Sequence, residues 1–161
     1  LIAFDGLFPF IQYRIRGGNM SYKMYKLDFG WEIAVPEGWI MEKRGQGSCI
    51  FYPENPEDET TIYASAFHSE DHKLLTPESL MKSAFERSIP ENSEALDIPT
   101  RLHCKAFTQL GADGVYRIGA GFYTEGELLS LNVYAKNEEK ANEAASGFSH
   151  TKFTRGGKNA F

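Results

Sequence analysis

The sequence is poor in cysteine, with only Cys49 and Cys104. No CxxC pair exists, which excludes a zinc knuckle and a thioredoxin-type redox motif. Each cysteine stands alone in an apolar, strand-like context, and this favours two buried thiols in a reducing compartment. A disulfide between them stays open as an alternative, because the sequence does not give their separation.

Basic residues and long apolar runs are also scarce. The chain has 17 Lys and Arg against 22 Asp and Glu, which gives a net charge of −5. A negative surface disfavours a phosphate backbone, and no basic run offsets it, so we expect no nucleic acid partner. No apolar stretch approaches the roughly 18 residues that a membrane helix needs, so we expect no membrane insertion. The 161 residues, 14% of them aromatic, suit one domain with an ordinary core.

The beginning of the chain differs from the rest. Its apolar run is broken by Asp5 and Pro9. Arg14 and Arg16 come after that run, whereas a secretory signal carries its charge first. We therefore expect translated upstream sequence, or a cloning remnant, before Met20. The expected organisation is a non-native or disordered extension at residues 1–19, a single domain at 20–153 and a flexible tail at 154–161.

Most of the remaining chain has the alternation of apolar and polar residues that is typical of half-buried strands. Turn residues separate these segments, and the connections are mostly too short for parallel pairing. We predict strands at residues 24–29, 31–35, 49–52, 60–67, 102–110, 115–124 and 128–135, with an optional edge strand at 151–153.

Two segments change to helical spacing. Thr76 is a good N-cap, Pro77 suits the first helical position, and Pro90 ends the segment. Asn137 caps a second helix, whose apolar stripe consists of small residues. The predicted fold class is therefore α+β: an antiparallel β-sheet of about six or seven strands packed with two main helices. The helices could cover one face together or one face each.

Residues 31–39, with the sequence WEIAVPEGW, resemble the opening of PsbP/Mog1-like domains, which begin with a strand followed by apolar-Pro-x-Gly-Trp. The start of the first helix (TPESL, residues 76–80), the late hairpin and the terminal helix are similar as well. The resemblance spans roughly residues 24–153 and implies a sandwich of an antiparallel sheet and helices. Members of this superfamily are mostly non-enzymatic, and some bacterial ones are cytoplasmic and bind protein segments.

The densest polar cluster lies between a strand and the first helix. There His68, Glu70 and His72 could ligate a divalent metal, because imidazole and carboxylate are both metal ligands. Their spacing matches no helical metal motif, and the more ordinary interpretation is a solvated loop. His103 and Cys104 do not form a catalytic pair, because neighbours on a strand point to opposite faces.

A second candidate site lies on the late strands. Gly119 and Gly121 fall inside a strand rather than between a strand and a helix, so they are no phosphate loop. They lie on one face without side chains, where a helix or a partner segment could approach closely. Tyr123 and Tyr134 fall opposite the main apolar rows of their strands, and exposed aromatic residues suit recognition.

These observations favour a non-catalytic, cytoplasmic, bacterial-type module that binds a protein partner through Gly119, Gly121, Tyr123 and Tyr134, without a cofactor. The alternative is a metal-dependent or small-molecule enzyme that uses the His68–His72 loop.

Overall fold

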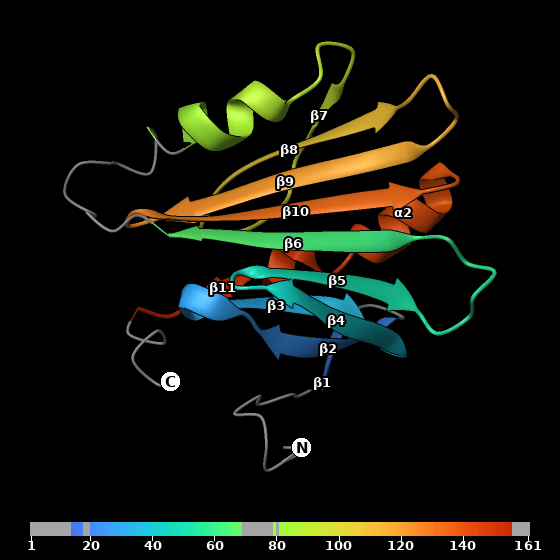
Figure 1. Ribbon diagram of the computed structural model, residues 1–161, viewed down its shortest axis with the longest axis horizontal. Helices are drawn as coiled ribbons and strands as arrows, with labels where there is room; N and C mark the ends of the chain where they lie inside the picture. Colours follow the sequence, from blue (N-terminus) through green and yellow to red (C-terminus); the bar gives the residue numbers. More distant parts are fainter. Residues whose placement is uncertain (1–13, 18–19, 69–78, 80, 156–161) are drawn as a thin grey trace.

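A computed structural model describes residues 14–17, 20–68, 79 and 81–155. The chain has an α+β fold in which the strands form two antiparallel sheets (Figure 1). The four-stranded sheet has the order β1 (Arg14–Gly17), β2 (Met20–Lys26), β3 (Trp31–Pro36), β11 (Lys152–Phe153). The seven-stranded sheet has the order β4 (Trp39–Gly45), β5 (Ser48–Pro53), β6 (Thr61–His68), β10 (Glu127–Ala135), β9 (Tyr116–Thr124), β8 (His103–Leu110), β7 (Glu94–Leu96).

The division into two sheets differs from the predicted single sheet. Pro36 ends β3, and after the turn at Gly38, with φ +88°, the chain enters β4 of the other sheet. The sequence analysis missed β4 and the short β7. Proline and glycine explain this turn: proline lacks a ladder donor, and glycine tolerates a positive φ.

One hydrophobic core joins the two sheets. Tyr25 of β2 meets Phe51 of β5, with ring centroids 5.0 Å apart. The helix α2 (Glu138–Ala145) lies behind β9 and β10 in Figure 1, and its Ala141 and Ala144 are fully buried in the same core. The short Ala side chains allow the helix to approach closely. The predicted cap is confirmed, since the side chain of Asn137 accepts a hydrogen bond from the Lys140 N–H at 2.8 Å.

Of the other predicted helix, the structure describes Ser79, which is α-helical, and the residues from Met81 onward. There a π-helical turn, η2 (Met81–Phe85), is followed by a 3₁₀ turn, η3 (Glu86–Ser88). It ends before Pro90 as predicted, with Ile89 in an extended conformation, which residues before proline prefer. The predicted N-terminal residues Thr76 and Pro77 lie outside the described residues.

The two helical segments lie on opposite faces of the large sheet. Met81 and Phe85 form a small cluster with Phe107 on one face, whereas α2 lies on the face that meets the four-stranded sheet. We call the face under η2 the outer face. Two further 3₁₀ turns are η1 (Asp28–Gly30) and η4 (Phe148–His150).

Part of the predicted N-terminal extension is ordered. Residues Arg14–Gly17 of the range 1–19 form β1 and pair with β2, which corrects the expectation of disorder for these four residues. The predicted edge strand near residue 153 is confirmed as β11, paired with β3. In the described part of the chain, no helix has the length and apolar character needed to span a bilayer.

Candidate functional site

The outer face carries exposed aromatic side chains over β6 and β10. Strand alternation and the register of the two strands place Tyr63 opposite Asn132, and Thr61 opposite Tyr134. Tyr63 is 45% exposed, Phe67 49% and Tyr134 36%. On the same face, Phe85 of η2 packs on Phe107 of β8 and over Gly121 of β9, whereas the large side chains of Tyr63, Phe67 and Tyr134 are exposed.

Tyr63, Tyr134 and Arg117 form what we call the tyrosine–arginine site. The two tyrosine rings meet edge to face, with centroids 5.7 Å apart and an interplanar angle of 85°. Arg117 of β9 lies opposite Tyr134 in the register. Its guanidinium carbon lies 5.6 Å from the centroid of the Tyr134 ring and 5.1 Å from that of Phe107. Two rings therefore hold the cation in place on the sheet.

A hydrogen-bond chain fixes the guanidinium further. Its Nη2 donates to Asn132 Oδ1 at 2.9 Å, and Asn132 Nδ2 donates to Ser130 Oγ at 3.1 Å. The Nε–H of Arg117 is enclosed and has no hydrogen-bond partner. A buried donor without a partner costs about 1–3 kcal/mol, which the two cation–π contacts and the charged hydrogen bond of the same guanidinium offset.

A shallow hollow of about 330 Å³ adjoins these side chains. Thr61, Tyr63 and Tyr134 line it. Its walls therefore offer two ring faces and edges together with hydroxyl groups, which can both donate and accept hydrogen bonds.

The structure corrects the predicted groove over Gly119 and Gly121. Both glycines are buried. A methyl group at Gly119 would lie within 2.4 Å of the Phe107 ring, and one at Gly121 within 2.7 Å of the Phe85 ring. Their missing side chains thus make room for two rings of the same chain, which leaves no open groove above them.

The two predicted tyrosines also do not flank one site. Tyr123 is half-buried, stacks on His103 with centroids 5.1 Å apart, and packs beside the Met81–Phe85 cluster. Tyr134 lies opposite Arg117, six residues from Tyr123 along β9. At roughly 3.3 Å per residue, the two tyrosines are separated by about 20 Å.

His68 of the predicted metal site ends β6 and faces Glu127 of β10. Its Nδ1 lies 2.5 Å from Glu127 Oε1, and Glu127 is buried. The imidazole stacks on Phe29, with centroids 4.9 Å apart and an interplanar angle of 12°. Glu70 and His72 lie outside the described residues. Among the residues that the structure does describe, no three His, Cys, Asp or Glu side chains gather as metal ligands.

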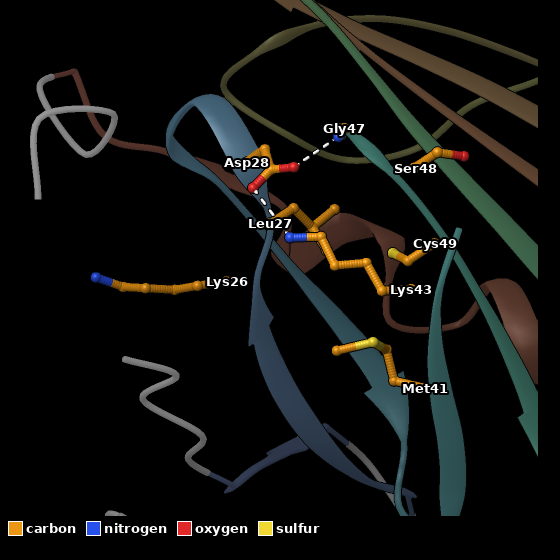
Figure 2. A pocket seen from close by; sticks show the side chains of 8 residues that line it. All are labelled: Lys26, Leu27, Asp28, Met41, Lys43, Gly47, Ser48 and Cys49. Atoms are coloured by element: carbon orange, nitrogen blue, oxygen red, sulfur yellow. Dashed lines mark hydrogen bonds and ion pairs between the residues drawn. The ribbon is translucent and has the colours of Figure 1, made fainter. Parts of the chain in front are cut away.

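A small pocket lies between η1 and the strands β4 and β5 (Figure 2). Its volume is about 30 Å³, which is room for one or two water molecules. Figure 2 shows Asp28 between two partners: its carboxylate accepts from the Gly47 N–H at 2.6 Å and pairs with Lys43 Nζ at 3.6 Å. Met41 and Cys49 belong to the same lining.

Neither cysteine is built to act as a nucleophile. Both thiols are free. Burial, together with the Asp28 charge, raises the pKa of Cys49 to about 12, against a smaller opposing effect of Lys43. Burial and the charge of Asp97 raise the pKa of Cys104 to about 12. Because the thiolate is the reactive form, a raised pKa lowers the reactivity that we expect of both residues at neutral pH. The predicted burial is confirmed for Cys49, whereas Cys104 is half-buried, and the alternative of a disulfide between them is not realised.

The sequence analysis missed Tyr63 and Arg117. The sequence signal that could have found them is the alternation of side chains along a strand. Tyr63 stands between the inward-facing Ile62 and Ala64, and Arg117 is a charged residue inside a strand. Only the cross-strand register brings them together, through β10.

No protein-family model matches the sequence, and no curated protein matches it. The fold is similar to a crystal structure at 1.50 Å resolution of a protein from Bacteroides thetaiotaomicron VPI-5482. The TM-score is 0.52 at 15% sequence identity, and the similarity covers 79% of this chain and 46% of that chain. The chain thus spans about half the length of its structural neighbour. At this identity the similarity shows the fold alone.

Proposed function

We propose that the chain is a non-catalytic module that binds a protein partner on the outer face of its large sheet, at the tyrosine–arginine site. The observation that carries the proposal is the exposure of Tyr63 and Tyr134 beside Arg117. Tyr and Arg are the side chains that most often dominate binding energy in protein interfaces. They sit on a rigid sheet, so little side-chain entropy is lost when a partner binds.

The neighbouring part of the outer face supports the proposal. Ser65 and Ser130 lie opposite each other, one alternation step beyond Tyr63 and Asn132. Their short side chains leave the surface lower there, and exposed Phe67 follows on the far side. A partner segment could therefore lie between aromatic side chains and meet hydroxyl groups below it.

We also propose that the chain is a PsbP/Mog1-like domain of bacterial, cytoplasmic type. The support comes from residues 31–39, where β3 leads through Pro36 and Gly38 to Trp39, and from the terminal helix α2. Partner binding without catalysis fits what this resemblance implies.

A second candidate is a metal-dependent or small-molecule enzyme that uses the His68 loop. The observation that favours it is the contact of His68 with the buried carboxylate of Glu127, because carboxylates orient metal-binding and catalytic imidazoles. Titration with Zn²⁺ or Mn²⁺, followed by calorimetry, tests it. Stoichiometric binding that is lost in His68→Ala supports this candidate, and no binding to the native chain contradicts it.

The binding proposal is tested by comparing the native chain with Tyr63→Ser/Tyr134→Ser as baits for protein partners. We expect a protein retained by the native chain to be lost from the double variant. The control is Leu110→Ser, which removes an exposed apolar side chain outside the site, at the end of β8. Loss of the partner in the control alone, or equal retention by all three chains, contradicts the proposed site.

A further inference from the structure

We infer that the partner is an extended protein segment that places an acidic side chain on Arg117 and an adjacent apolar or aromatic side chain on Tyr63 and Tyr134. This inference rests on the proposed function, because it names the chemistry of the partner at the same site.

The first observation is the charge of Arg117. Five basic side chains of the described residues pair with carboxylates: Lys43 with Asp28, Arg44 with Glu42, Lys105 with Glu86, Lys140 with Asp58, and Arg155 with Glu125. Arg117 has no carboxylate partner among the described residues. Its contacts are two aromatic rings and one neutral amide. A half-buried cation with this environment lacks a counter-charge.

The second observation is the fixed position of that cation. Phe107 and Tyr134 bracket the guanidinium, and Asn132 holds one of its terminal nitrogens. Arginine has five N–H donors in a planar fork that matches the two oxygens of a carboxylate. A fork that is already oriented loses little entropy when it binds a carboxylate.

The third observation is the adjacent hollow of Thr61, Tyr63 and Tyr134. It lies beside the cation because Tyr134 contributes both to the hollow and to the contact with Arg117. A ligand that fills both places must carry a negative group next to an apolar or aromatic one. Asp or Glu beside a hydrophobic residue in an extended segment has this arrangement, since neighbouring side chains lie close together along a strand.

The net charge of the whole chain restricts the class of ligand further. With a net charge of −5, the protein repels polyanions at long range. A single positioned arginine on an acidic protein therefore suits one local carboxylate, whereas a nucleic acid requires several phosphate contacts.

The test is selection of random 12-residue peptides displayed on phage against the native chain, followed by synthesis of the enriched peptides. We expect Asp or Glu beside an apolar or aromatic residue in the enriched set. Replacing that acid by its amide should weaken binding at least tenfold. Arg117→Gln should weaken binding of the acidic peptide by a similar factor. The amide-bearing peptide and Arg117→Gln together should weaken binding little more than either change alone.

Two controls keep the result interpretable. Arg101→Gln removes an exposed arginine that precedes β8. This variant should bind the acidic peptide with the affinity of the native chain. The amide-bearing peptide tests the charge pairing against the unaltered protein, so the conclusion does not depend on the folding of Arg117→Gln, which thermal unfolding checks.

The outcomes separate the two claims. Peptides that lose binding in Tyr63→Ser/Tyr134→Ser but tolerate removal of their acid, or bind Arg117→Gln unchanged, overturn the acidic-segment inference and leave the proposed function standing. If no peptide is enriched over background, both claims fail.

Discussion

At the scale of single residues, Gly119 and Gly121 show how a missing side chain shapes the surface. The sequence indicates that something approaches the sheet closely at these positions, and this prediction is confirmed. It cannot say whether the neighbour is an internal ring or a partner, because Phe85 and Phe107 belong to segments far away along the chain. The rings of those two residues occupy the space, and the exposed part of the outer face begins beyond them.

We expect Gly119→Ala to lower the free energy of unfolding by about 1–3 kcal/mol, because the added methyl group would overlap the buried Phe107 ring. Urea unfolding monitored by tryptophan fluorescence measures this. The double variant Gly119→Ala/Phe107→Leu should cost less than the sum of its single changes, since the smaller side chain makes room for the methyl group. Gly119→Ala with native stability would refute the packing described.

The two thiols give a second prediction at this scale. With a pKa of about 12 in the folded chain against an ordinary value of 9.0, each carries about a thousandfold less thiolate than an exposed cysteine at pH 8. A thiol-specific chromogenic reagent should therefore react slowly with the native chain and rapidly in urea. The variants Cys49→Ser and Cys104→Ser assign each signal, and fast reaction of either thiol in the native chain would contradict its burial.

At the scale of elements, local signals predicted α2 and most of the longer strands, although β1, β4 and β7 were missed and the strand predicted at 24–29 lies at Met20–Lys26. The N-cap at Asn137 and the small apolar stripe of α2 are properties of neighbouring residues, so they can be recognised without tertiary information. The segment Met81–Ser88 shows the limit of this reasoning. Helical spacing was predicted there, and Met81 and Phe85 are buried on one side, but the spacing did not predict the π and 3₁₀ turns.

Asp58 connects two elements, and its stabilising effect depends on pH. Burial disfavours its charge, but hydrogen bonds from the Thr60 hydroxyl and N–H and the charge of Lys140 on α2 prevail and lower its pKa below the ordinary value of 3.8. A lowered pKa means that the stabilisation is present above pH 3.8 and is lost as the pH falls through the folded-state pKa. The carboxylate thus stabilises the loop before β6 at neutral pH.

We expect Asp58→Asn to lower the free energy of unfolding at pH 7 by roughly 0.5–1 kcal/mol through the weakened Thr60 hydrogen bonds. The difference from the native chain should shrink as the pH falls below 3.8. Urea unfolding at pH 7 and pH 3 measures it, with Glu57→Gln as the neighbouring exposed control. An equal deficit at both pH values would argue against a charge effect.

At the scale of the whole molecule, strand pairing decides both the fold and the site. Alternation tells which residues share a face of one strand, but not which strand lies beside it. For this reason the α+β class was predictable, whereas the division into two sheets was not. The same reason explains why Tyr134 was recognised as an exposed residue while its neighbours Tyr63 and Arg117, from β6 and β9, were missed.

The most direct test of the account is amide chemical-shift mapping by NMR during titration with an enriched acidic peptide. The account predicts that the largest shifts fall on β6, β10 and β9 around Tyr63, Asn132 and Arg117, and that they vanish in Tyr63→Ser/Tyr134→Ser. Shifts centred on the pocket near Asp28 and Cys49, or on His68, would contradict the claim that the outer face is the binding surface.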